Sequence, residues 1–196
     1  MRQFIGKIFA AWMLLAGWAQ AQSPVVIELF TSQGCASCPA ADNLLAQLGA
    51  RDDVIPLALH VDYWDYIGWK DTFAQHAFTR RQKAYARVSK RNVIYTPQMI
   101  VNGEKDVVGN RPLDLAEMLI SAKFTAPKAS VDIARVDDIL TVSAQALGAG
   151  VGPADIHVIR YLPEQMQKIA KGENAGLSQR YTHIVTDWTT PATWDG

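Results

Sequence analysis

The feature that most constrains the fold is a Cys-x-x-Cys motif, in which Cys35 and Cys38 are the only two cysteines of the chain. An apolar run at residues 25–30 precedes the motif and predicts a buried strand. The motif is followed by apolar residues at i, i+3, i+4 and i+7, which predict one face of a helix with Pro39 in its first turn: Ala41, Leu44, Leu45 and Leu48. We therefore expect the motif at a strand-to-helix turn, where the helix N-terminus would stabilise a Cys35 thiolate.

The spacing of the two cysteines favours redox exchange over other uses of a cysteine pair. A bridge between Cys35 and Cys38 closes so short a loop that it would stabilise the fold by at most about 2 kcal/mol. A closed structural zinc site takes four ligands, and the chain has no second cysteine pair. Thiol–disulfide exchange uses both residues, whereas a silent structural disulfide and a two-thiolate metal site remain the alternatives.

Residues 1–21 are predicted to be a secretory signal peptide. Arg2 and Lys7 form a basic start, residues 8–18 are apolar but too few to cross a membrane comfortably, and residues 19–21 read Ala-Gln-Ala, a typical cleavage signal. Cleavage after Ala21 would export the protein to the periplasm or the medium, and an uncleaved N-terminal anchor is the alternative. In such an oxidising compartment the cysteine pair is expected to form a disulfide.

The charge balance gives no reason to expect nucleic acid or an acidic membrane as a partner. The chain has 19 Lys and Arg against 19 Asp and Glu, and the signal peptide holds two of the cations and none of the anions. The exported chain therefore carries a small net negative charge. No later apolar run is long enough for a transmembrane helix, so no membrane contact is expected after cleavage.

A second buried strand is predicted at residues 54–62, and a helical crossover would make it parallel to the first. Four aromatic residues, two aspartates and a histidine lie at its carboxyl end, between His60 and Trp69. Sites in open α/β sheets form at such strand ends. This segment either covers the edge of the sheet, with its aspartates capping turns, or forms a wall beside Cys35 that shapes a substrate groove.

A long helix is predicted from Thr72 to about Arg91, because Thr72 and Gln75 have capping-box spacing. Its expected inner face consists of Ala74, Ala77, Phe78, Tyr85 and Val88. Cations recur at helical spacing on another face and predict a solvated stripe, with the steering of an acidic partner as a weaker alternative: Arg80, Lys83, Arg87 and Lys90.

A hairpin and a last helix are predicted next. Asn102-Gly103 between two strand-like runs is a strong hairpin signal. The helix is expected from about Pro112, with acidic residues early and Lys123 late, which matches the helix dipole. Its expected inner face consists of Leu115, Ala116, Leu119 and Ile120.

The predicted order is strand, Cys-x-x-Cys helix, strand, helix, strand, strand and helix, which resembles a thioredoxin fold. In that fold the loop before the third strand carries a cis-proline that faces the Cys-x-x-Cys, and Pro97 matches it by position. Thr96-Pro97 resembles the form common in thioredoxin and glutaredoxin relatives. The resemblance implies a tight functional turn whose neighbouring backbone pairs with an extended substrate.

A closer resemblance covers nearly the whole exported chain. It is carried by the runs at residues 26–35, 60–66, 95–99 and 171–176. These runs are similar to a family of secreted bacterial proteins catalogued as domain of unknown function 1223, within the thioredoxin-like superfamily. The resemblance implies an α/β, thioredoxin-like fold and export, and it assigns no activity.

Three residues are candidates to handle the proton of the resolving cysteine. Thioredoxins keep a buried acid six residues before the first cysteine, whereas here the acid, Glu28, lies seven residues before Cys35. Because side chains alternate along a strand, this offset turns Glu28 to the other face unless the turn absorbs a residue. His60 and Asp62, at the end of the second strand, are the other candidates.

From Lys128 onward the helical periodicity ends, and short strands separated by turns are predicted. Residues 22–126 are therefore expected to form the thioredoxin-like domain, and residues 127–196 a small antiparallel β-domain, such as a sandwich. The chain is expected to stop before this domain is complete, which would leave an open sheet edge. Residues 172–176 are polar and turn-rich, and we interpret them as a loop and not as a site.

The leading hypothesis is an exported thiol–disulfide oxidoreductase without a cofactor, acting on a protein or small-molecule thiol or disulfide. Cys35 would attack or receive the disulfide and Cys38 would resolve it, while Thr96 and Pro97 hold the substrate backbone. The first alternative is a binding protein whose two thiolates, with or without His60, hold Cu(I). The second is a structural module whose β-domain binds a partner and whose disulfide is idle.

Overall fold

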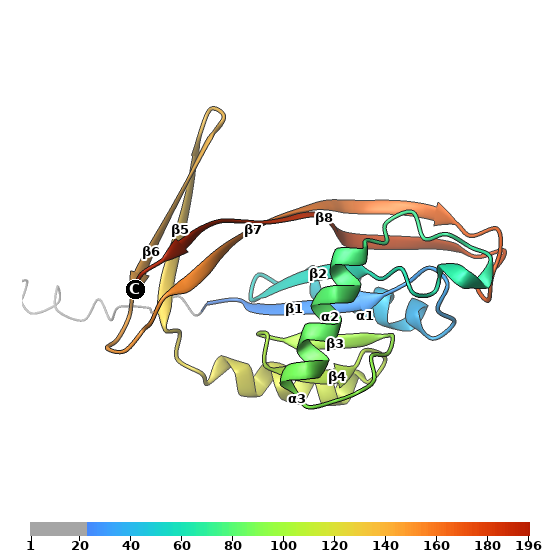
Figure 1. The fold of residues 1–196 in the computed structure, drawn as a ribbon, viewed down its shortest axis with the longest axis horizontal. Coiled ribbons are helices and arrows are strands. Elements are labelled where there is room, and N and C mark those ends of the chain that lie inside the picture. The colour runs from blue at the N-terminus through green and yellow to red at the C-terminus, as the bar shows by residue number, and fades with distance from the viewer. Residues whose placement is uncertain (1–22) are drawn as a thin grey trace, which may run out of the picture.

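The computed structural model describes residues 23–196, so the expected signal peptide and its cleavage site lie outside the described residues. In this range the chain is a mixed α/β protein with three helices, and most of its ordered backbone is sheet (Figure 1). In chain order the elements are β1 (Val25–Thr31), α1 (Cys38–Leu48), β2 (Val54–His60), the short 3-10 helix η2 (Asp65–Ile67), α2 (His76–Val88), β3 (Gln98–Val101), β4 (Lys105–Val108), α3 (Pro112–Lys123), β5 (Ala129–Val136), β6 (Ile139–Ala146), β7 (Ala154–Lys168) and β8 (Ser178–Trp194).

Six strands form one sheet in the order β4-β3-β1-β2-β8-β7. β1 and β2 are parallel, as expected for strands joined through α1. β3 and β4 form the predicted hairpin, whose turn residues Asn102 and Gly103 have φ angles of 48° and 71°. Positive φ at both turn positions is the conformation that Asn-Gly favours, so the hairpin prediction is confirmed.

β7 and β8 join this first sheet instead of forming the separate β-domain expected for residues 127–196. β8 pairs in parallel with β2 at Ala58 and Ile184, and β7 pairs antiparallel with β8. The physical reason is burial, because Tyr181, Ile184 and Val185 of β8 are each at most 1% exposed when packed there. Only β5 and β6 form a second, two-stranded sheet, which projects from the rest of the molecule in Figure 1.

The main sheet carries helices on both faces. α1 and α3 pack with Ile27 and Leu29 of β1 on one face, and α2 packs with Phe30 on the other. Because side chains alternate along a strand, the face to which a residue points decides whether it can reach the Cys-x-x-Cys helix. By this alternation Glu28 points toward α2, whereas His60 points toward α1.

α2 begins at His76 and not at Thr72, where the sequence predicted it. Gln75 is extended, with φ −131° and ψ 133°, and its backbone N–H donates to the His60 carbonyl at 3.0 Å. This hydrogen bond ties the preceding segment to the end of β2, so the expected capping box is not formed. Four residues expected on inner helix faces are exposed instead: Ala77, Val88, Ala116 and Ile120.

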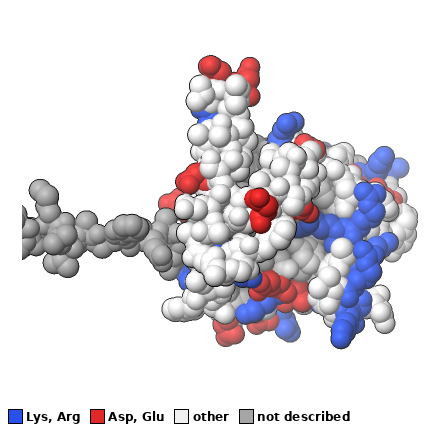
Figure 2. Space-filling model, turned by 60° about the vertical axis from the view of Figure 1, so that its left-hand side comes forward, with Lys and Arg blue, Asp and Glu red and all other residues white. Residues whose placement is uncertain are grey.

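The cations of α2, together with Lys90 just after its end, form the solvated stripe that was predicted. Arg80, Lys83, Arg87 and Lys90 are all exposed, and Figure 2 shows a band of Lys and Arg side chains along one side of the molecule. Among residues 23–196 none of these four cations forms an ion pair. No helix in this part of the chain combines the length and the apolar character needed to cross a membrane.

Candidate functional site

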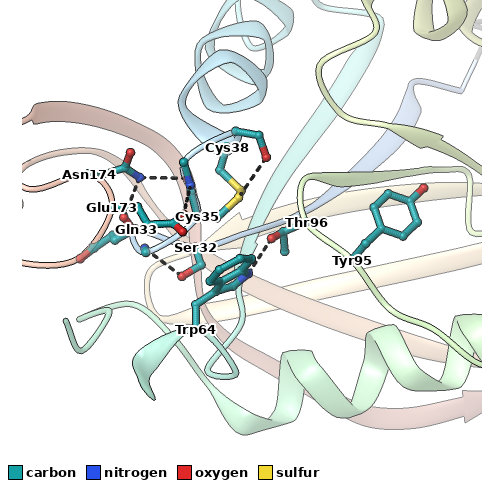
Figure 3. The surroundings of a disulfide bond; sticks show 12 residues. Ser32, Gln33, Cys35, Cys38, Trp64, Tyr95, Thr96, Glu173 and Asn174 are labelled. Carbon is teal, nitrogen blue, oxygen red and sulfur yellow. Dashed lines mark hydrogen bonds between the residues drawn. A yellow bond between two sulfur atoms is a disulfide. The ribbon is translucent and has the colours of Figure 1, made fainter. Parts of the chain in front are cut away.

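Cys35 and Cys38 form a disulfide at the start of α1 (Figure 3). Their Cα atoms are 5.4 Å apart, and the helix begins at Cys38, with Pro39 in its first turn. Cys35 lies in the turn just before the helix, where its carbonyl accepts the Cys38 N–H at 3.1 Å. Cys35 is 1% exposed and Cys38 is 0% exposed. A reaction partner can therefore reach Cys35 only after a neighbouring segment moves.

The aromatic segment after β2 lies against this turn. A Cβ atom added to Gly34 would lie 3.0 Å from Ile67 Cδ1 and 3.2 Å from Trp64 Cβ, so both side chains contact the turn closely. Trp64 stacks on Tyr66, with ring centroids 6.4 Å apart, and Tyr66 is 82% exposed. The segment therefore forms an aromatic wall beside the Cys-x-x-Cys turn, and Asp65 Oδ1 also accepts the Asp71 N–H at 3.1 Å, the turn-capping role that the other interpretation expected.

The loop before β3 completes the surroundings of the disulfide. The Thr96–Pro97 peptide bond is cis, as expected from the sequence position of Pro97. The Trp64 indole N–H donates to Thr96 Oγ1 at 2.7 Å and so links this loop to the aromatic wall (Figure 3). A Cβ atom at Gly109 would lie 3.0 Å from Pro97 Cβ and 3.1 Å from Ala41 Cβ, which puts the proline against the first turns of α1.

The turn between β7 and β8 also reaches the Cys-x-x-Cys. Asn174 is 5% exposed, and its Nδ2 donates to the carbonyls of Gln33 and Cys35, both at 2.9 Å. Glu173 Oε2 accepts the Ala36 N–H at 3.3 Å. Residues 172–176 form a loop, as interpreted from the sequence, but the sequence interpretation missed their place at the disulfide. The available signal was their membership in the run 171–176 that carries the family resemblance.

His60 belongs to a buried hydrogen-bond chain that leads to the Cys-x-x-Cys turn. Its Nδ1 lies 2.8 Å from Asp71 Oδ2, and the same oxygen accepts the Gln33 N–H at 2.7 Å. Burial disfavours the ionised Asp71, but His60 and the N–H groups of Gln33 and Phe73 outweigh burial and hold the pKa of Asp71 below its usual value. His60 was predicted from the sequence, whereas Asp71 was not, because its local sequence resembles that of any loop aspartate.

Asp42 is a second buried acid that the sequence analysis missed. It follows Cys38 by one helical turn, so the two side chains share a face of α1. Asp42 is 3% exposed, and within residues 23–196 neither its carboxylate oxygens nor His60 Nε2 have a hydrogen-bond partner. Burial raises the pKa of Asp42 to about 7, against the opposing effects of His60 and of the nearby Thr31 hydroxyl. The signal in the sequence was an aspartate beside Ala41 in an apolar stripe.

Glu28 lies away from the disulfide, on the α2 face of β1. Arg81 donates to both of its carboxylate oxygens, at 2.6 and 2.7 Å, and the Tyr85 hydroxyl donates at 2.7 Å. Arg81 also stacks over the ring of Trp188, with 3.9 Å from Cζ to the centroid. The Glu28–Arg81 pair borders a cavity of about 700 Å³ at the end of β1 remote from Cys35. Because Glu28 lies seven and not six residues before Cys35, its side chain points to the α2 face of the sheet and not to the face of the Cys-x-x-Cys helix.

Asp62 is also directed to α2. Its Oδ1 accepts the Thr79 hydroxyl at 2.5 Å, and its Oδ2 lies 2.8 Å from His76 Nδ1. These contacts and the backbone outweigh partial burial and lower the pKa of Asp62. Asp62 therefore anchors the first turns of α2 and takes no part in the surroundings of the disulfide.

Five of the seven predicted site residues are thus gathered at one end of the sheet: Cys35, Cys38, Thr96, Pro97 and His60. Within residues 23–196, no group of three His, Cys, Asp or Glu side chains is placed to hold a metal ion. What the gathered residues offer is a disulfide next to a cis-proline loop and a buried His–Asp pair. Such a disulfide is compatible with redox activity.

Comparisons with known proteins agree with this architecture. The family described as "Protein of unknown function (DUF1223)" matches residues 26–196. The crystal structure of protein AGR_C_4864 from Agrobacterium tumefaciens is similar, with a TM-score of 0.79 and 38% identity over 91% of this chain and 77% of that one. HBP35 of Porphyromonas gingivalis is similar in fold alone, with a TM-score of 0.61 and 16% identity over 87% of this chain and 57% of that one. No curated protein sequence matches the chain.

Proposed function

The chain belongs to the DUF1223 family, and we propose that it is an exported thiol–disulfide oxidoreductase on a thioredoxin-like scaffold. The observation that carries this proposal is the Cys35–Cys38 disulfide at the N-terminal end of α1, beside the loop with the cis Thr96–Pro97 peptide. The order β1-α1-β2-α2-β3-β4-α3, with α2 opposite α1 and α3, supports the scaffold. The basic, then apolar start of the sequence supports export.

In the proposed reaction a thiolate of the substrate attacks Cys35 Sγ. A bond forms between these two sulfurs, the Cys35–Cys38 bond breaks, and Cys38 leaves as a thiolate that takes up a proton. A second substrate thiolate then attacks the substrate sulfur of the mixed disulfide and releases Cys35. The substrate is oxidised by two electrons and the protein is reduced to the dithiol. The reverse sequence reduces a substrate disulfide.

Asp42 replaces Glu28 and Asp62 as the group that exchanges a proton with Cys38. Glu28 and Asp62 are both committed to α2, whereas Asp42 shares a helix face with Cys38 and is buried without a hydrogen-bond partner in the described chain. An acid with a pKa of about 7 can give or take a proton near neutral pH. His60, held by Asp71, would stabilise the ionised form of Asp42 after the transfer.

A trapping experiment tests the function. Cys38→Ser leaves Cys35 to form mixed disulfides that nothing resolves, so covalent adducts with glutathione or with periplasmic proteins should accumulate. Cys35→Ser is the matched control and should form none. The absence of adducts in Cys38→Ser would contradict the proposal. A reduction potential well below about −300 mV would also contradict it and would make the disulfide structural.

A further inference from the structure

The turn at residues 169–177, which joins β7 to β8, is built to hold one geometry. Ile169 is fully buried, and its N–H donates to the Leu177 carbonyl at 2.9 Å. Gly176 N–H donates to the Ile169 carbonyl at 2.8 Å, and Gly172 and Gly176 have φ of 80° and 89°. A Cβ atom at Gly172 would lie 3.1 Å from Ile67 Cδ1, so the turn also packs on the aromatic wall.

This turn places the exposed Glu173 carboxylate beside the Cys-x-x-Cys. The buried Asn174 amide bridges the Gln33 and Cys35 carbonyls and so ties the turn to the Cys-x-x-Cys. Its neighbour Glu173 is thereby held with Oε2 on the Ala36 N–H, at 3.3 Å (Figure 3). Lys171, in the same turn, is exposed and forms no ion pair within residues 23–196. Glu173 is therefore the charged group of the turn that contacts the residue after Cys35.

The carboxylate competes with the Cys35 thiolate for the same stabilisation. Backbone N–H groups at a helix N-terminus favour an anion, and this effect normally lowers the pKa of a cysteine there. The Glu173 carboxylate already accepts the Ala36 N–H. Its negative charge also repels a thiolate on Cys35, one residue away. The thiolate of the reduced pair is therefore less stable than the helix alone would make it.

We propose that Glu173 sets the redox balance of the Cys35–Cys38 pair, as a positioning residue that disfavours the Cys35 thiolate. A less stable thiolate disfavours the reduced pair relative to the disulfide, so Glu173 makes the pair a stronger reductant. This inference rests on the proposed function, because it assumes that the pair cycles between disulfide and dithiol. It names a charged group that biases the direction of electron flow, whereas Ala36 and Ser37 are uncharged and the Ser37 hydroxyl lies 3.5 Å from Cys35 Sγ.

The test is a charge series at position 173 in the full exported chain. Glu173→Gln keeps an oxygen acceptor for the Ala36 N–H and removes the charge, and Glu173→Lys reverses the charge. Glu104→Gln is the matched control, because Glu104 is exposed in the β3–β4 turn, at the opposite end of β1 from Cys35. The pKa of the Cys35 thiol is measured on reduced protein from thiolate absorbance against pH. Equilibration with glutathione gives the redox balance of each variant.

We expect about threefold more thiolate in Glu173→Gln at a pH below the pKa, and roughly tenfold more in Glu173→Lys. Both variants should also be reduced more readily by glutathione. The differences should shrink in 1 M salt, because screening weakens a charge effect and leaves a packing effect unchanged. The circular dichroism of the oxidised variants checks that they are folded.

Two results would overturn the inference. One is an unchanged thiol pKa in Glu173→Gln and Glu173→Lys, and the other is an equal change in Glu104→Gln. Failure of the proposed function gives a different result, because then glutathione would neither reduce the disulfide nor form adducts with Cys38→Ser. The thiol pKa, measured after chemical reduction, would still report on Glu173.

Discussion

Replacing Asp42 by Asn should stabilise the protein, and the gain should grow with pH. Asp42 has an ordinary pKa of 3.8 in the unfolded chain and a pKa raised by burial to about 7 in the folded one. The folded state therefore binds the proton more tightly, and stability falls as the pH rises from about 4 to about 7. Asn mimics the protonated carboxyl and has no charge to bury.

The magnitude follows from the shift. One pKa unit corresponds to about 1.4 kcal/mol, so the full penalty of the buried Asp42 carboxylate above pH 7 is at most about 4 kcal/mol. Part of this penalty is already present at pH 5, because at that pH the Asp42 carboxyl is mostly ionised in the unfolded chain but still protonated in the folded one. Between pH 5 and pH 8 the advantage of Asp42→Asn over the wild type should therefore increase by roughly 2–3 kcal/mol.

Urea denaturation of the oxidised proteins at pH 5, 6, 7 and 8 measures this increase. Subtracting the wild-type curve cancels the titration of groups common to both proteins. Asp52→Asn is the control, because Asp52 is exposed in the loop between α1 and β2. An advantage of Asp42→Asn that stays constant from pH 5 to pH 8 would refute the assignment of a raised pKa to this carboxyl.

Two further predictions concern packing around the sheet. Arg81→Ala leaves the Glu28 carboxylate, which is 3% exposed, without its cation. The free energy of unfolding should therefore fall by about 3 kcal/mol. Adding Glu28→Gln to the same chain removes the unpaired charge and should largely restore the stability. A loss under 1 kcal/mol in urea denaturation would speak against a buried pair. Gly109→Ala places a Cβ 3.0 Å from Pro97 Cβ, and should lower the thermal midpoint through an overpacking cost of about 1–3 kcal/mol. An unchanged thermal midpoint would show that the loop before β3 can move away from the added Cβ without a cost in stability.

The local features of the site could be predicted because each is encoded within a few neighbouring residues. The apolar run before Cys35 and the stripe after it specify a strand followed by a helix, and Asn102-Gly103 specifies a hairpin through its positive φ angles. These signals were sufficient to place the disulfide at a strand-to-helix turn. They were not sufficient for the start of α2, where a hydrogen bond from Gln75 to His60 overrides the local capping pattern.

The sequence by itself determined the Cys-x-x-Cys pair and its position at the start of a helix, and its resemblance to a thioredoxin fold indicated the cis-proline at Pro97. Only the tertiary structure showed that the turn leaves the one-residue offset of Glu28 uncorrected, so that Glu28 binds Arg81 on the α2 face, and that Asp42 is buried on the helix face of Cys38. It also brought Glu173 and Asn174 to the Cys-x-x-Cys from the far end of the chain. Contacts at such separation depend on β8 docking beside β2, and the burial that drives this docking leaves no local pattern in the sequence.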